Sequence, residues 1–312
     1  MGLTESVSDY FGVQEHGSSV RTELLAGLTT FLTMSYIVVV NPAILASAIS
    51  IEGIPQGEIQ SMLAVVTIIA AATATFIMAV YANRPFAQAP GLGLNAFFAF
   101  TVVGALGIPW QTALAAVVVE GILFIVLTVI GAREYVINLF PKPVKFAVGT
   151  GIGLFLAIIG LQAMGIVVDD PATLVALGGV ASNPVAIVSV LGLFFTLALY
   201  ARDVPGSIIL GIAVTTVVGW LVTVFGPVAP DAGLVAGATS TTYDITPLAG
   251  AFVSGFGNVE AFSFALIVFT FFFVDFFDTA GTLVGVGQAG GFLDENGDLP
   301  EIDRPLMADA VG

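Results

Sequence analysis

Apolar segments of about twenty residues recur along the chain, and they decide what it can fold into. They lie near 23–48, 59–81, 111–131, 147–167, 184–200, 205–226 and 262–285, with a further one beginning at about 305. About 20 apolar residues suffice for a helix to cross a bilayer. The chain is 57% hydrophobic and only 9% charged, whereas a soluble domain carries about 25% charged residues. The sequence therefore predicts an all-α polytopic membrane protein.

The basic residues predict how these spans are oriented. If the N-terminus lies in the cytoplasm, all seven Lys and Arg side chains fall on the cytoplasmic side, and the outer segments (49–58, 107–110, 168–183 and 227–261) contain none. This is the asymmetry expected of loops that stay inside. We therefore expect a multi-pass protein of the plasma membrane with a cytoplasmic N-terminus. The basic residues are Arg21, Arg84, Arg133, Lys142, Lys145, Arg202 and Arg304.

Composition also excludes several classes of function. The chain has no Cys and a single His, His16, so thiolate sites and His clusters for a metal are excluded. A GxGxxG match at 285–290 follows a predicted membrane helix rather than a strand, which argues against a dinucleotide site. We expect no cofactor, no metal, no nucleic-acid partner and no enzymatic activity. The net charge of −15 suggests adaptation to high salt, in a halophilic source.

A shorter apolar piece at 89–106 is interrupted in a way that the other segments are not. Its opening, APGLGLNA at residues 89–96, contains Pro90 and two glycines, which disfavour a helix. The remainder is too short to span alone. Extended chain followed by a half-helix is tolerated at membrane depth where it lines a cavity. An ordinary span with a Pro-Gly entry loop is the alternative. Asn95 would lie at the start of the half-helix.

Three acids lie inside predicted spans. Asp275 and Asp278 are three residues apart and share one helix face, while Glu120 lies in the middle of the span 111–131. Acids within membrane spans face protein or a wet cavity, and they mark substrate or proton pathways. We interpret Asp275 as a ligand-binding acid. For Asp278, beside Thr279, a functional and a structural role are equally open. For Glu120, a structural or proton-relay role is as open as contact with a ligand.

The first span is unusually polar. Thr33 belongs to a group of hydroxyl and amide residues there that could line a pathway, although Ser and Thr often only join membrane helices. Amides elsewhere suit the recognition of a polar heterocycle, and Asn95 is the best placed. The group in the first span is Thr29, Thr30, Thr33, Ser35, Tyr36 and Asn41, and the other amides are Gln88, Asn95 and Gln162.

Three stretches together resemble the nucleobase–ascorbate transporter superfamily, in its adenine/guanine/hypoxanthine permease (AzgA-like) branch. They are TELLAGLTTFLTMSYI at 22–37 followed by NPAIL at 41–45, GLGLNAFFAF at 91–100 and VDFFDTAGTLVGV at 274–286. The resemblance extends from about residue 10 to the end of the chain. It implies fourteen segments in two inverted sevens, with a strand and half-helix as segment three. It also implies proton-coupled purine uptake by an elevator movement against a gate that commonly dimerises.

The resemblance also implies roles for particular residues. Asp275 matches the acid of segment eight that binds the purine, Asn95 matches the amide of segment three, and Asp278 matches a second acid of segment eight. Backbone groups from Gly93 to Ala96 could contact the base. The domains expected are a cytoplasmic tail (1–22), a first repeat (23–226), an extracellular linker (227–261) and the start of a second repeat (262–312).

One departure from the family pattern leaves alternatives open. The family's second substrate-proximal acid lies in segment ten, and these 312 residues end before it. We therefore expect a C-terminally truncated chain that does not transport by itself or that needs a partner. A uracil or xanthine transporter, an ion or anion channel, and an inactive fragment remain alternatives. The preferred purine, the choice between proton and sodium coupling, and a homodimer also stay open.

Overall fold

Long apolar helices dominate the computed structural model of the chain. The structure describes residues 2–132, 142–204, 206–226, 228, 234, 243–258, 260–295 and 299–312. Within these residues, five helical stretches are long and apolar enough to cross a membrane by length and composition: 20–46, 56–82, 110–129, 207–225 and 261–290. Shorter apolar helices include 184–200. The spans predicted near 59–81, 111–131, 184–200, 205–226 and 262–285 are thus recovered as helices, while Arg133 lies outside the described residues.

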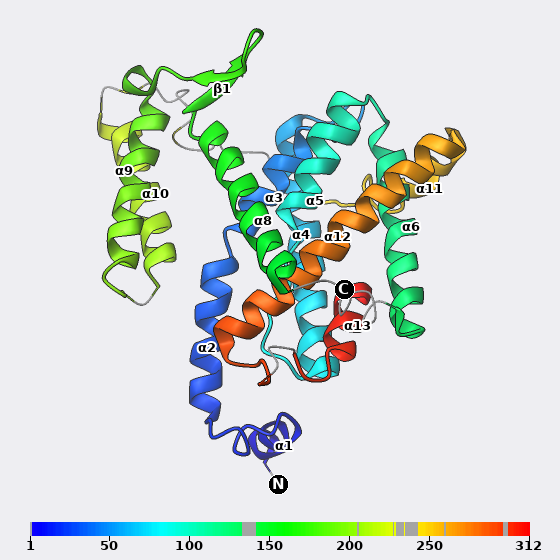
Figure 1. Ribbon diagram of the computed structural model, residues 1–312. Coiled ribbons are helices and arrows are strands. Elements are labelled where there is room, and N and C mark those ends of the chain that lie inside the picture. The colour runs from blue at the N-terminus through cyan, green and yellow to red at the C-terminus, as the bar shows by residue number, and fades with distance from the viewer. Residues whose placement is uncertain are drawn as a thin grey trace. The chain divides into compact units, whose positions relative to one another are not determined.

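The chain divides into two compact units, of which the first comprises Met1–Ile152 and Ser240–Gly312. In this unit α3 packs against α4, α12 (orange in Figure 1) packs against α5 and α6, and α11 lies on α6. The helices are α1 (Leu3–Tyr10), α2 (Val20–Met34), α3 (Ile37–Ala46), α4 (Gln56–Ala82), α5 (Leu92–Ala96), the π-helix η1 (Phe97–Ala105), α6 (Trp110–Val129), α11 (Ala251–Gly255), the 3-10 turn η3 (Phe256–Asn258), α12 (Ala261–Gly290) and α13 (Asp303–Val311).

The second unit, Gly153–Thr239, holds the end of α8 (Lys142–Ala163) and a helical pair. The helices α9 (Pro184–Tyr200) and α10 (Ser207–Phe225) pack side by side (Figure 1). Asn183 begins α9 by accepting hydrogen bonds from the N–H groups of Val185 (3.0 Å) and Ala186 (3.5 Å), with Pro184 at the first helical position. This is a favourable cap, because Asn satisfies N–H groups that have no helical partner.

The expectation of an all-α chain needs one correction. Strands β1 (Val167–Asp170) and β2 (Leu174–Leu177) form an antiparallel hairpin, followed by the short 3-10 helix η2 (Val180–Ser182). Asp170 holds the turn by accepting from the N–H groups of Ala172 and Thr173, each at 2.8 Å. A carboxylate that accepts from nearby backbone N–H groups favours a tight turn, so two short apolar runs can pair across it.

The first predicted span is also not one continuous helix. The α2 helix ends at Met34 and α3 begins at Ile37, with Ser35 donating its hydroxyl to the Leu32 carbonyl at 2.8 Å. A Ser side chain that bonds to the preceding turn competes with the regular helix ladder and bends the chain. The bend separates an exposed α2 from the partly buried α3, whose Asn41 is only 2% exposed.

Two apolar core clusters lie within the first unit. The first core cluster contains Ile44, Ala46, Ile49, Ile59, Leu63, Phe98, Ala99, Val102, Trp110, Ala113, Ala116, Ile267, Val268 and Phe271. The second core cluster contains Met78, Ala82, Phe86, Phe124, Phe276, Ala280, Leu283, Leu299, Leu306 and Ala308. Three helices, α4, α6 and α12, contribute to both clusters. The side chains of these helices that lie between the two clusters therefore determine the chemistry of the interior.

Candidate functional site

Polar side chains occupy the interval between the two core clusters on all three shared helices. They are Thr67 on α4, Glu120 on α6 and Asp275 on α12. Each follows the last member of the first core cluster along its helix and precedes the first member of the second. Thr67 is 2% exposed, Glu120 is 6% exposed and Asp275 is half-buried. The interior of this unit therefore has a polar layer, formed by these three residues, between its two apolar clusters.

The broken segment enters this layer as extended chain. Residues 83–91 form no helix and pair with no strand in the described structure, so the strand expected in segment three is not found. Pro85 and Pro90 lack the N–H groups that a strand ladder needs. Instead, the Thr75 hydroxyl accepts from the N–H of Gln88 (2.9 Å) and donates to its carbonyl (3.2 Å). One α4 side chain thus satisfies the backbone of Gln88.

The expected half-helix follows. Gly91 is the N-cap of α5, and the Asn95 N–H donates to the Gly91 carbonyl at 3.1 Å. The helix then widens into the π-helix η1, a form that is rare and frequently found at functional sites. Ala96 is 1% exposed, whereas a side chain at Gly93 would meet nothing within 4 Å. Asn95 lies between these two positions in the sequence and is half-buried.

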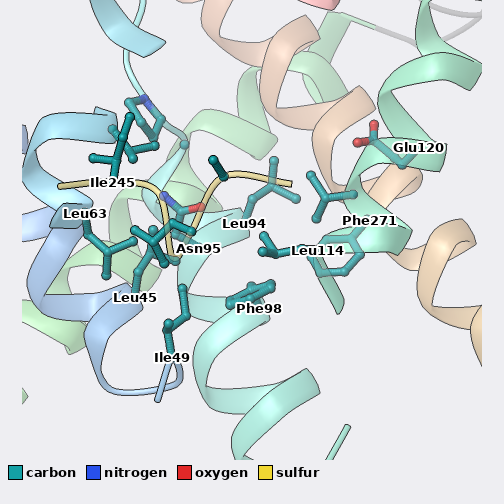
Figure 2. Close-up of a pocket in the computed structure, with 16 residues that line it drawn as sticks. Leu45, Ile49, Leu63, Leu94, Asn95, Phe98, Leu114, Glu120, Ile245 and Phe271 are labelled. Carbon is teal, nitrogen blue, oxygen red and sulfur yellow. The ribbon is translucent and has the colours of Figure 1, made fainter. Parts of the chain in front are cut away.

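Asn95 lines a cavity of about 450 Å³ that is otherwise almost wholly apolar. Ligand pockets are commonly 300–1,000 Å³, apolar, with a few polar groups that fix orientation. Among the described lining residues, Asn95 and Glu120 supply the polar side chains, and Figure 2 shows them in different parts of the lining. The lining residues are Leu45, Ile49, Leu63, Val66, Pro90, Gly91, Leu94, Asn95, Phe98, Leu114, Val117, Glu120, Ile245, Leu248, Ala249 and Phe271.

A chain of hydrogen bonds connects Asn95 to two transmembrane helices. The Asn95 amide nitrogen donates to the Asn41 side-chain oxygen, and the Asn41 amide nitrogen donates to the Thr67 hydroxyl at 2.9 Å. The Thr67 hydroxyl donates in turn to the Leu63 carbonyl at 2.7 Å. The broken segment is therefore joined to α3 and α4 through Asn41 and Thr67, which are both buried and hydrogen-bonded.

The two acids of α12 have different surroundings. Asp278 lies against the broken segment, because a Cβ at Gly91 would be 2.8 Å from its Oδ2. Its carboxylate lies near the Thr282 hydroxyl and the Asp309 carboxylate. Asp275, one turn earlier, belongs to the polar layer but is not among the described residues that line the cavity. Its role in binding stays a prediction.

The other predicted site residues lie apart from the cavity lining. Thr279 is 7% exposed and donates to Asp309 Oδ2 at 2.9 Å, which joins α12 to α13. Thr33, on α2, donates to the Thr29 carbonyl of its own helix at 2.9 Å. The structure therefore brings Asn95 and Glu120 to one cavity and leaves Thr33 and Thr279 outside its described lining.

Comparison with known proteins gives the family. A model described as the permease family matches residues 21–312. The chain belongs to this family. The resemblance to nucleobase–ascorbate transporters that its motifs carry is confirmed, and the permease is a polytopic membrane protein.

Several named relatives resemble the permease along nearly all of its length. Adenine permease AdeP of Escherichia coli is 38% identical over 312 residues, covering 99% of this chain and 65% of that protein. Guanine/hypoxanthine permease PbuG of Bacillus subtilis is 39% identical over 303 residues, covering 96% and 67% respectively. A protein of Methanocaldococcus jannaschii, named as a permease without a substrate, is 40% identical, covering 99% and 67%. The chain spans about two thirds of the length of these relatives.

Two polar residues of the interior were not predicted as site residues. Thr67 carried no signal, because a Thr within a membrane helix ordinarily bonds to its own backbone. Asp309 lies where a further span was expected to begin, with no motif around it. A signal did exist for Asn41, as part of the polar group in the first span. The sequence does not reveal that Asn41 connects Asn95 to Thr67.

Proposed function

We propose that this permease transports purine nucleobases such as adenine, guanine or hypoxanthine. The observation that carries the proposal is the cavity, in which an amide from a broken membrane segment and a buried carboxyl interrupt an apolar lining. A purine base is a flat aromatic ring system whose faces lack hydrogen-bonding groups, with N–H donors and ring-nitrogen acceptors on its edge. A cavity with apolar walls and a few fixed polar groups suits such a ligand. The names of the relatives AdeP and PbuG point to the same substrate class.

In the proposed complex, Asn95 contacts the base directly and Asp275 accepts an N–H from it. A carboxylate that accepts from a ring N–H makes a charge-assisted hydrogen bond, which is stronger than a neutral one. Backbone groups of Gly93 and Ala96 would add contacts. Thr279 would support the site. Asp278 and Glu120 would support it or carry a coupling proton, because no Lys or Arg lies within the predicted spans to neutralise these two acids.

The same proposal includes the transport cycle. We expect proton-coupled uptake across the plasma membrane, with the N-terminus in the cytoplasm and with the unit that holds the cavity moving as one body. The two core clusters support this last point, since α4, α6 and α12 each take part in both. A homodimer, and sodium in place of the proton, remain open parts of the proposal.

The test is uptake of radiolabelled adenine and hypoxanthine by cells that express the protein in the full length its gene encodes. Asp275→Asn should reduce uptake to background, since losing a charge-assisted bond of about 1.5–3 kcal/mol lowers affinity roughly 10- to 150-fold. The amount of protein in the membrane should not change. Asp169→Asn, at an exposed position in the hairpin, is the matched control.

Three results would separate this proposal from its alternatives. Wild-type uptake by Asp275→Asn would refute the role of that acid. Uptake that does not saturate, or that other purines do not compete for, would favour a channel. Uptake of radiolabelled uracil or xanthine, without uptake of adenine or hypoxanthine, would reassign the substrate.

A further inference from the structure

The hydrogen-bond chain that ends at Leu63 has a fixed direction. A backbone carbonyl can only accept, so the Thr67 hydroxyl must donate its one hydrogen to the Leu63 oxygen, 2.7 Å away. Thr67 Oγ1 can then only accept from Asn41. The amide nitrogen of Asn41, 2.9 Å from that oxygen, is the matching donor. The helix backbone of α4 therefore determines which way the Asn41 amide is turned.

This direction passes on to Asn95. With its nitrogen committed to Thr67, Asn41 presents its oxygen to the broken segment, and the Asn95 amide nitrogen donates to it. Amide orientation is assigned from such a network, because the two ends of an amide look alike. Asn41 and Thr67 are each 2% exposed, so water cannot readily replace a lost partner. Reversing Asn95 would bring two acceptor oxygens together.

We propose that Asn41 and Thr67 are positioning residues that hold the Asn95 amide oxygen toward the cavity. Within the described part of the chain, this oxygen accepts no hydrogen bond, and Figure 2 shows it on the side of the amide that faces Leu94 and Leu114, which line the cavity. The polar group that Asn95 offers a ligand is thus an acceptor. The ligand must place an N–H against it. This inference rests on the proposed function and narrows it to bases with a donor at that edge.

The inference predicts that the base needs an N–H donor for tight binding, which we call the donor requirement. It also predicts that this requirement depends on Thr67, which does not contact the base. In the wild-type protein, removing the N–H that meets Asn95 should weaken binding about tenfold, the worth of one such hydrogen bond. In Thr67→Val, the Asn41 amide loses its acceptor and either end of it can face Asn95. The donor requirement should then fall to about twofold. Thr67→Ser keeps the hydroxyl and should restore it.

The experiment measures competition for uptake in the protein expressed in the full length its gene encodes. Parent bases are compared with analogues that each lack one donor group. Purine lacks the exocyclic amino group of adenine, and 1-methyl- and 9-methylhypoxanthine each lack one ring N–H of hypoxanthine. Thr128→Val is the matched control, because Thr128 is also buried and donates to the carbonyl four residues earlier at 2.8 Å. It lies outside the described cavity lining, so the control should keep the tenfold requirement.

Two outcomes overturn the inference. One is a wild-type protein for which no analogue is weaker than its parent, a comparison that needs no variant to fold. The other is a Thr67→Val protein that keeps the full donor requirement, or that loses affinity for parents and analogues equally. If the wild-type protein takes up no purine at all, the proposed function fails first. That result is distinct from uptake without a donor requirement.

Discussion

The contact between α11 and α6 leads to a sharp prediction for Gly255→Ala. At Gly255 the two backbones approach so closely that a Cβ would overlap the Gln111 carbonyl and lie 2.8 Å from the Thr112 nitrogen. These are backbone atoms, which cannot rotate out of the way. The Thr112 hydroxyl also donates to the Gly255 carbonyl at 3.2 Å. One added methyl group must therefore push α11 off the beginning of α6.

The cost follows from these contacts. Overpacking a rigid site costs about 1–3 kcal/mol, and losing the hydrogen bond from Thr112 adds about 1 kcal/mol. The sum of roughly 2–4 kcal/mol should lower the melting temperature by about 5–10 °C. Binding should weaken as well, because the segment leading into α11 supplies Ile245, Leu248 and Ala249 to the cavity.

The assay is thermal unfolding in detergent, followed by the fraction of protein that stays monodisperse on size exclusion. Gly257→Ala is the matched control, since it adds the same methyl group two residues later where nothing lies within 4 Å. Thr112→Val isolates the hydrogen bond and should account for about 1 kcal/mol of the loss. Equal melting temperatures for the Gly255→Ala and Gly257→Ala proteins would refute the reasoning.

Two further predictions concern α12. Gly91→Ala should lower stability by about 1 kcal/mol, the low end of the overpacking range, because its Cβ would lie 2.8 Å from Asp278 Oδ2 and the carboxylate must rotate away, whereas Gly93→Ala meets nothing within 4 Å; equal melting temperatures would contradict this. Hydrogen bonds from the side chain and backbone of Ser263 hold the pKa of the Glu260 carboxyl at the start of α12 below its ordinary 4.5. A lowered folded-state pKa stabilises the protein above the unfolded-state value, and the stabilisation is lost as pH falls through the folded-state pKa. Glu260→Gln should therefore flatten the acid side of the stability profile below about pH 4.5, and an unchanged slope would count against the cap.

The helices and the broken segment were predictable because local composition encodes them. Apolar length marks the spans, and Pro90 with its neighbouring glycines marks the break, which placed Asn95 correctly at the beginning of a half-helix. The π-helix after it was not predictable. Its nine residues are as apolar as an ordinary span, and the wider turn shows no pattern in hydropathy. Asn95 and Glu120 were both proposed as site residues, and nothing in the sequence could show that they share a cavity.

The site residues that the sequence did not predict depend on which helices pack together, and two threonines illustrate this. Thr33 and Thr67 both lie in membrane helices and both donate to the carbonyl four residues earlier. The sequence favoured Thr33, because it belongs to a polar group. Thr67 is nevertheless the one that also accepts from Asn41. Whether a hydroxyl has a second partner depends on which helix packs against it, and hydropathy does not contain that information.

The hydroxyls of Thr67 and Thr75, which hold the broken segment to α4, also restrict insertions and deletions in this helix. Thr67 reaches Asn95 through Asn41, and Thr75 holds Gln88 directly. Eight residues of helix separate these attachment points by about 12 Å. Inserting or deleting a single residue between them would rotate one hydroxyl by about 100° from its partner without altering the apolar character of the span. The stretch of α4 between Thr67 and Thr75 thus tolerates the substitution of one apolar residue for another. It does not tolerate an insertion or deletion, which would rotate one threonine relative to the other.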